Sequence, residues 1–212
     1  MSKLGLQENS LAIGNQLKAE ILIQGIRPLL WNHLQPSESF GKRQERGGTA
    51  GNDPSEWQRN VLVTENRQLY LLPTHIFGCL RDAAKYTKRG RSSLTSQLAS
   101  TLQVQDRQVL INRYLPDEPI RASEEIEQEV YIFMSVVKNI ATRGRNIRYR
   151  VAAAPGWQCS FTLLWDKTII SRHEMQAVAI DAGKLVGLAD GRSIGYGRFE
   201  VMQFDVYSAG EF

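Results

Sequence analysis

The stretch Gly187-Leu-Ala-Asp-Gly-Arg-Ser-Ile-Gly-Tyr-Gly-Arg-Phe199 is the most informative part of this sequence. It carries four glycines in eleven residues, together with two arginines and one tyrosine. Glycine is favoured where the backbone takes positive φ or approaches another segment closely. Arginines beside such a loop can form forked hydrogen bonds with phosphate, and exposed backbone N–H groups can add to the same anion site. The stretch therefore predicts either a tight turn into a last strand or a loop that approaches a ligand.

Two nucleotide-binding motifs are excluded at this loop. It lacks the Gly-Lys-Ser/Thr of a Walker sequence, and Glu200 occupies the position of the third glycine in a dinucleotide fingerprint. We therefore expect no nucleotide cofactor. The two cysteines, Cys79 and Cys159, have no partners at metal-ligand spacing, so we also expect no metal site and two buried thiols.

Length and charge limit the class of protein. The chain has 212 residues, 42% hydrophobic residues and a net charge of +4, which fits one large domain with a genuine core. Five basic and no acidic residues lie in 138–150, seven basic and two acidic in 81–113, and six acidic and one basic in 117–129. This segregation predicts separate basic and acidic faces. Because the N-terminus lacks a signal-peptide core and no membrane span is evident, we expect a cytoplasmic protein with no membrane partner.

Hydrophobic periodicity predicts mixed secondary structure along the chain. Strands are predicted over 18–26, 61–63, 69–71, 109–115, 130–137, 158–165 and 198–206. Two helices are predicted over 74–86 and 93–102. A third helix is predicted to begin at the capping box Ser171-x-x-Glu174 and to end at Gly183. The first two short strands, 61–63 and 69–71, are predicted to pair as a hairpin. The run 130–137 is apolar on both faces and predicts a central strand. Gly78, inside a helix, suggests close packing against another backbone.

This order of elements predicts an α+β fold in which helices cover one side of an antiparallel sheet. Residues 35–58 are polar and rich in glycine and proline, which predicts a long loop that is either a disordered insertion or orders on a partner. The basic segment 138–156 contains Tyr149 between two arginines. Aromatic rings among arginines can stack on bases while the cations hold phosphates, although an ordinary charged surface hairpin has the same composition.

Three segments resemble the RAMP superfamily, which includes the backbone subunits of CRISPR effector complexes. Gly-Arg-Ser-x-Gly-Tyr-Gly-Arg-Phe within Gly187–Phe199 is similar to the glycine-rich loop of that superfamily. Leu72-Pro-Thr-His-Ile-Phe-Gly-Cys-Leu-Arg81 is similar to its entry into the first helix, and Gly25-Ile-Arg-Pro-Leu-Leu30 to the end of its first strand. The three segments occur in the expected order. The chain departs from the pattern at His75 and Ile76, where the family usually has small residues.

The resemblance implies a ferredoxin-like or RRM-like core in a single domain of residues 1–212, with insertions near 35–58 and 88–127. It also implies a non-catalytic subunit of a CRISPR-type ribonucleoprotein or a related mobile-element system, which polymerises along single-stranded guide RNA and assembles with other effector subunits. Target DNA or RNA is a further partner to test. Phosphate contacts are then expected from Lys85, Arg89, Arg143, Arg145, Arg148, Arg192 and Arg198, base stacking from Tyr149 and Tyr196, and close backbone approach to RNA or to the first helix at Gly191, Gly195 and Gly197.

Two other functions fit the same sequence. The first is an endoribonuclease of the same superfamily that uses His33, after the first strand, or Asp53, in the long loop. A histidine can act as general acid or base near neutral pH, but the sequence shows no partner for His33. The second is a structural or protein-interaction module whose basic segments face solvent or acidic proteins. The absence of an evident acid, base and metal constellation favours a binding protein over an enzyme.

Overall fold

Strand β1 (Gln16–Gly25) is an interior strand of the larger sheet. The computed structural model describes residues 14–33, 53–138 and 144–208, and in it Ala19, Ile21 and Ile23 are buried on one face of this strand. β1 pairs in antiparallel register with β11 (Gln158–Asp166) on one side and with β12 (Phe199–Ser208) on the other. Because alternate residues of a strand point to opposite faces, the three neighbouring strands present one continuous apolar face.

The larger sheet is completed by strands from the middle of the chain, β3 (Gln68–Leu71), β6 (Gln103–Val104) and β7 (Val109–Tyr114). The strand order is β12-β1-β11-β7-β3, and β6 also pairs with β11. The segment 88–127 therefore supplies two strands of this sheet. Within the full order of elements, β1, α2, β7, β11, α4 and β12 occur in the succession of a β-α-β-β-α-β pattern, with the other strands and helices between them.

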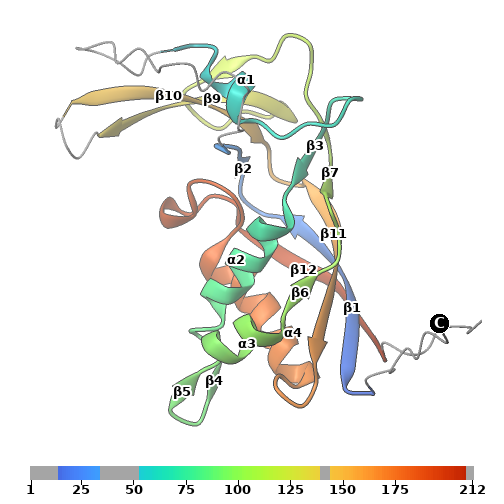
Figure 1. Ribbon diagram of the computed structural model, residues 1–212. Coiled ribbons are helices and arrows are strands. Elements are labelled where there is room, and N and C mark those ends of the chain that lie inside the picture. Colours follow the sequence, from blue (N-terminus) through green and yellow to red (C-terminus); the bar gives the residue numbers. More distant parts are fainter. Residues whose placement is uncertain (1–13, 34–52, 139–143, 209–212) are drawn as a thin grey trace, which may run out of the picture.

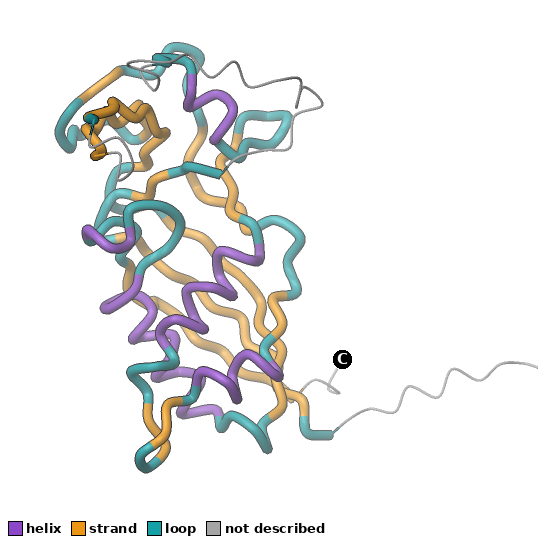
Figure 2. The backbone as a smooth tube through the Cα atoms, turned by 60° about the vertical axis from the view of Figure 1, so that its left-hand side comes forward, coloured by secondary structure: helices purple, strands orange, loops and turns teal. Residues whose placement is uncertain are grey.

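Three helices cover one face of this sheet: α2 (Pro73–Ala83), α3 (Thr95–Thr101) and α4 (Arg172–Asp181) (Figures 1 and 2). The capping box of α4 is present, since the Ser171 hydroxyl accepts from the Glu174 N–H at 3.3 Å and the Glu174 carboxylate accepts from the Ser171 N–H at 2.9 Å. The predicted α+β class, with an antiparallel sheet and helices on one face, is confirmed.

A second, smaller sheet was not predicted. Its strand order is β2-β10-β9-β8, with β8 parallel to β9 and the other pairs antiparallel. The strands are β2 (Leu29–Leu30), β8 (Arg121–Ala122), β9 (Val130–Lys138) and β10 (Arg145–Ala153). β9 and β10 form a long hairpin that projects away from the helices, with the short helix α1 (Glu56–Asn60) against it (Figure 1). A third unit, the ribbon of β4 (Lys88–Arg89) and β5 (Ser92–Ser93), lies at the opposite end of the molecule.

Two strand predictions are met only in part. Val63 and Leu69 pair in antiparallel fashion as the predicted hairpin requires, but through a single bridge, and β3 also pairs with β7 through Leu71 and Val109. The run 130–137 is a strand with a neighbour on each side, β10 and β8, but it lies in the smaller sheet, and Val136 near the far end of the hairpin is 64% exposed. An apolar run on both faces therefore did not identify the centre of the larger sheet.

Two glycine predictions are also wrong. At Gly183 the chain continues into the π-helical turn η1 (Ala182–Val186), and the helical segment ends at Gly187, with φ 86°. Gly183 is needed instead because a Cβ there would collide with the backbone of Phe199. At Gly78 no atom lies within 4 Å of the place a Cβ would occupy, so this glycine does not mark a close backbone approach. Of the predicted loop 35–58, residues 56–58 belong to α1, and residues 34–52 lie outside the described residues.

The main core lies between the larger sheet and its helices and contains three buried tryptophans. The indole N–H of Trp31 donates to the carbonyl of Tyr70, that of Trp157 to Arg27 and that of Trp165 to Ile170, each at 2.9 Å. Burial of a large ring is favourable only when its polar atom is paired, which these backbone acceptors provide. Both predicted buried thiols, Cys79 and Cys159, are found in this core.

Candidate nucleic-acid interface

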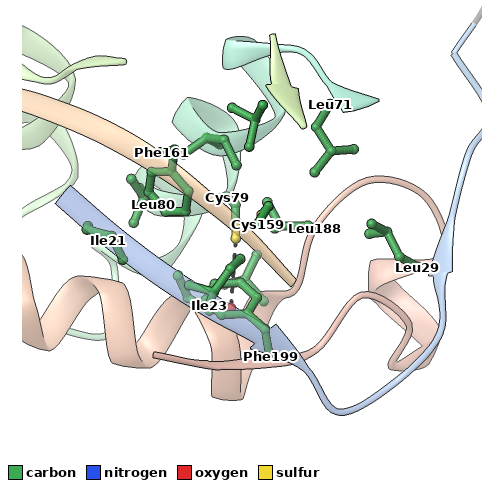
Figure 3. Packing of buried hydrophobic residues seen from close by; sticks show 14 of the residues in the cluster. Ile21, Ile23, Leu29, Leu71, Cys79, Leu80, Cys159, Phe161, Leu188 and Phe199 are labelled. Carbon is green, nitrogen blue, oxygen red and sulfur yellow. Dashed lines mark hydrogen bonds between the residues drawn. The ribbon is translucent and has the colours of Figure 1, made fainter. Parts of the chain in front are cut away.

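The glycine-rich loop is held at both ends by side chains in the main core. Leu188 and Phe199 are buried beside Ile23 and Cys159 (Figure 3). Between these anchors the Leu188 N–H donates to the carbonyl of Gly197 at 2.9 Å, which closes the base of the loop. Residues 189–198 therefore form a loop that leaves the main core and returns to it, with both of its ends fixed.

The loop also lies directly against the end of the first strand. The Asp190 N–H donates to the Leu30 carbonyl at 3.1 Å, and the Gly197 N–H donates to the Pro28 carbonyl at 2.8 Å. The carbonyl of Arg198 accepts from the Ile26 N–H at 2.9 Å. Two of the three segments that carry the family resemblance thus meet through backbone hydrogen bonds.

The glycines give the loop its shape. Gly191 and Gly195 both take left-handed conformations and flank the short 3-10 turn η2 (Arg192–Ile194). Gly197 has φ 68°, and a Cβ there would collide with the backbone of Leu188. The positive φ values agree with the sequence analysis. The close approach, however, is within the loop itself and not to the first helix.

The third segment, α2, faces the loop across an open hollow of about 670 Å³. Arg81 and Lys85 line it from α2 and the turn after it, and Arg192 and Arg198 line it from the loop. The only carboxylates in its lining are Asp82 and Asp190. Four cations and two carboxylates leave a formal excess of two positive charges. The hollow is therefore a place where an anion is electrostatically favoured.

The ion pairs in the hollow leave its positive charge only partly compensated. Arg81 and Arg192 share one carboxylate, that of Asp82, at 2.9 Å and 3.2 Å. Asp190 is engaged by Arg150 of β10, with 2.6 Å between Oδ2 and Nε, and this pair connects the loop to the smaller sheet. Among the described residues, Nη1 of Arg198 is shielded from solvent and has no hydrogen-bond partner.

The structure brings together part of the predicted site. Lys85, Gly191, Arg192 and Arg198 line the hollow, and Gly195 and Gly197 shape the loop. Arg89 does not join them. It lies in the β4–β5 ribbon and forms a two-pronged pair with Glu174, at 2.8 and 2.7 Å, and these hydrogen bonds lower the pKa of Glu174 to about 2.

The predicted residues of the basic segment 138–156 lie elsewhere, on the β9–β10 hairpin. Arg145 is exposed, Arg148 forms an ion pair with Glu56 of α1, and the half-buried Tyr149 lies under the guanidinium of Arg121 at 5.9 Å. Arg143 lies outside the described residues.

Tyr196 packs against neighbouring side chains. Its ring lies 5.5 Å from that of Phe133, between ring centroids, and 5.9 Å from the guanidinium of Arg27. It therefore helps to fix the loop to the smaller sheet. Its predicted role in base stacking stays a prediction.

Two residues that line the hollow, Arg81 and Tyr86, were not predicted from the sequence as site residues. Arg81 ends the helix-entry segment, and its place one turn before Lys85 was a usable signal. Tyr86 follows Lys85 and lines the hollow with 45% of its surface exposed. Its position after the end of α2 gave no periodic signal.

The structure gives His33 a partner that the sequence analysis did not find. The rings of His33 and His75 lie 5.5 Å apart in an edge-to-face arrangement. Burial, then the nearby His33 and Arg192, lower the pKa of His75 to about 4, so its ring is neutral at pH 7. Nδ1 of His75 accepts from the Leu72 N–H at 3.3 Å.

Asp53, the other catalytic candidate, has a local structural role. Its carboxylate accepts from the N–H of Ser55 at 3.0 Å and pairs with Arg59 at 2.6 Å. In the described part of the chain, no three histidine, cysteine or acidic side chains gather in a way that could hold a metal ion. No helix there is long and apolar enough to cross a membrane.

No protein-family model matches the chain, and no curated protein matches it either. One similar solved structure is described as the cryo-EM structure of the Type III-B Cmr-beta bound to cognate target RNA. The match has a TM-score of 0.45 and 15% sequence identity, and it covers 93% of this chain and 63% of the other. This chain thus spans less than two thirds of the length of its structural neighbour.

Proposed function

We propose that this protein is a non-catalytic subunit that binds single-stranded RNA through the hollow between α2 and the glycine-rich loop. The observation that carries the proposal is the convergence of Arg81, Lys85, Arg192 and Arg198 on one open hollow with only two carboxylates. Guanidinium groups bind phosphate oxygens in a forked geometry, and a lysine adds a mobile point charge. Such a hollow would bind the phosphate backbone of a nucleic acid and would not distinguish between base sequences.

The resemblance to the RAMP superfamily supports a more specific proposal. Of the three segments that carry it, the loop and Arg81 of the helix-entry segment line the hollow, and the end of β1 contacts the loop through backbone hydrogen bonds. In that superfamily such subunits hold guide RNA in CRISPR effector complexes. We propose the same role here, with other copies of this chain and other effector subunits as partners, a ferredoxin-like core, no cofactor and a cytoplasmic location.

Salt-dependent binding of a fluorescent single-stranded RNA decamer tests the RNA proposal. With three or four phosphates neutralised, log K should fall with log salt with a slope of about −2 to −3, at roughly −0.7 per phosphate. The triple variant Arg81→Gln, Lys85→Gln, Arg192→Gln should flatten that slope by about 2.

A matched control removes the same net charge elsewhere. Arg59, Arg107 and Lys167 are exposed and do not line the hollow, so their triple glutamine variant should keep the wild-type slope. Equal flattening in both variants would show that binding follows total charge and not this site. Absence of binding at low salt would leave the structural or protein-interaction module as the better account.

The His33–His75 pair favours one second candidate, an endoribonuclease. Because Nδ1 of His75 accepts a hydrogen bond from a backbone N–H, the proton of its neutral ring is on Nε2. His75 therefore has no free ring nitrogen to accept a proton, and His33 would be the general base of the reaction. His33 would take the proton of a ribose 2′-hydroxyl, the 2′-oxygen would attack phosphorus, and the 5′-oxygen would leave with a proton from water. Cleavage of bound RNA that disappears in both His33→Gln and His75→Gln would establish this activity. Intact RNA after prolonged incubation, with or without Mg²⁺, would support the binding role.

A further inference from the structure

We propose that Tyr86 is the stacking platform for one base of the RNA strand whose phosphates occupy the hollow. This inference rests on the proposed function and adds a contact to the bases at the same site. Base–aromatic stacking is tolerant of sequence because every base has a π-face, so it suits a protein that holds a strand without reading it.

The position of Tyr86 is fixed by the backbone around it. Its N–H donates to the Ala83 carbonyl at 2.9 Å, which makes it part of the turn that ends α2. The Leu94 N–H, at the start of α3, donates to the carbonyls of Ala84 and Thr87 at 3.1 and 3.3 Å and so holds both sides of this turn. The backbone that carries the ring is therefore held in place before a ligand arrives, which lowers the entropic cost of binding.

The ring of Tyr86 combines exposure with adjacent positive charge. It is 45% exposed and lines the hollow together with Arg81 and Arg192. The ammonium of Lys85 lies over one face of the ring, 4.7 Å from its centre. A base that stacks on the other face of Tyr86 therefore has a cation nearby for its flanking phosphate, which is the combination that single-strand binding sites use.

The two tyrosines predicted from the sequence to stack on bases, Tyr149 and Tyr196, lie outside the hollow that Tyr86 lines. Tyr196 is in contact with Phe133 and Arg27, and Tyr149 packs against the main core below Arg121. Neither lines the hollow. Tyr86 is thus the tyrosine that shares a surface with the four cations of the hollow.

The test compares two ligands, a decamer of adenosine and a decamer of the same ribose-phosphate backbone without bases. Tyr86→Ala should weaken binding of the adenosine decamer by about tenfold to a hundredfold and leave the abasic decamer unchanged, because stacking needs a base. Tyr86→Phe should bind both ligands like wild type. Tyr114→Ala is the matched control, since Tyr114 is 55% exposed on β7 and does not line the hollow, and it should change neither affinity.

Two results would overturn the inference. Equal weakening of both decamers by Tyr86→Ala would mean that the ring only shapes the hollow, and wild-type binding of both would mean that it has no role. In either case, salt-dependent binding that still requires Arg81, Lys85 and Arg192 would leave the proposed function intact. If the wild-type protein bound neither decamer, the result would contradict both the proposed function and this inference.

Discussion

The two basic regions of this chain look alike in sequence and differ in the folded molecule. Around the hollow, Arg81 and Arg192 share the one carboxylate of Asp82, and Lys85 projects from an exposed turn. On the β9–β10 hairpin, Arg148 and Arg150 each have a carboxylate of their own, from Glu56 and Asp190. The hollow therefore keeps an excess of positive charge, whereas the charges of Arg148 and Arg150 are compensated within the protein.

Under the proposed function, this difference means that a basic stretch predicts a nucleic-acid site only when its charges stay uncompensated. An arginine that already pairs with a carboxylate must break that pair before it binds phosphate, and the exchange gains little free energy. The following predictions test the contrast between the hollow and the hairpin, from the largest expected effect to the smallest.

The largest effect is expected from Gly197→Val, which should disrupt the loop that forms one wall of the hollow. The residue has φ 68°, and the new side chain would collide with the backbone of Leu188. We expect a loss of about 3 kcal/mol or more in the free energy of unfolding, measured in urea, together with loss of RNA binding.

Gly195→Ala is the control for this variant. Gly195 also has positive φ, but no atom lies within 4 Å of the place of its Cβ. The cost should be only the backbone preference, about 1–2 kcal/mol. Equal losses in the two variants would contradict the packing described for the loop.

The second effect concerns the ion pair that joins the hollow to the smaller sheet. Asp190→Ala leaves the Arg150 guanidinium, whose side chain is only 15% exposed, without its carboxylate, and should cost about 2 kcal/mol. The double variant Asp190→Ala, Arg150→Met should lose less than the sum of the two single variants. Strictly additive losses in this double-mutant cycle would show that the pair does not couple the two regions.

The third effect is a pH dependence at His75, beside the hollow. Its pKa is about 4 in the folded protein and 6.5 when unperturbed, so the unfolded chain binds more protons between these values. The free energy of unfolding should therefore fall as pH decreases from 6.5 to 4, by about 1–2 kcal/mol after allowance for solvent screening of the half-buried ring.

His75→Gln should lack this contribution, because glutamine can accept the Leu72 N–H but does not titrate in that range. Urea unfolding of both proteins at several pH values measures the difference. Parallel pH profiles for the two proteins would be evidence against a depressed pKa at His75.

The smallest effect on RNA affinity is expected from a substitution of Arg148 on the β9–β10 hairpin. Because Arg148 is paired with Glu56, Arg148→Gln should change RNA affinity by less than about twofold and leave the salt slope nearly unchanged. Arg192→Gln should flatten the same slope by about 0.7 if its guanidinium meets one phosphate. A larger effect of Arg148→Gln would restore the sequence-based interpretation, in which the hairpin arginines hold the RNA.

Local patterns predicted most elements of this fold. The alternation of Ala19, Ile21 and Ile23 predicted β1, and the capping box of Ser171 and Glu174 predicted the start of α4. Both signals depend on residues a few positions apart, whose geometry is fixed by the strand or helix itself. The features that local patterns did not predict, such as the second sheet and the place of β9 in it, are choices of strand pairing, which depend on segments far apart in the sequence.

The sequence by itself determined the positions of the glycine-rich loop, of the start of α2 and of the basic residues. Only the tertiary structure decided which of those residues form the candidate site. Arg89 is paired with Glu174, 85 positions away, and Arg148 with Glu56, 92 positions away. An ion pair requires its charged atoms to lie within about 4 Å, and that proximity is created only when distant segments fold against each other. Tyr86 is a candidate for the same reason, since the hollow it lines exists only where α2 and the loop face each other.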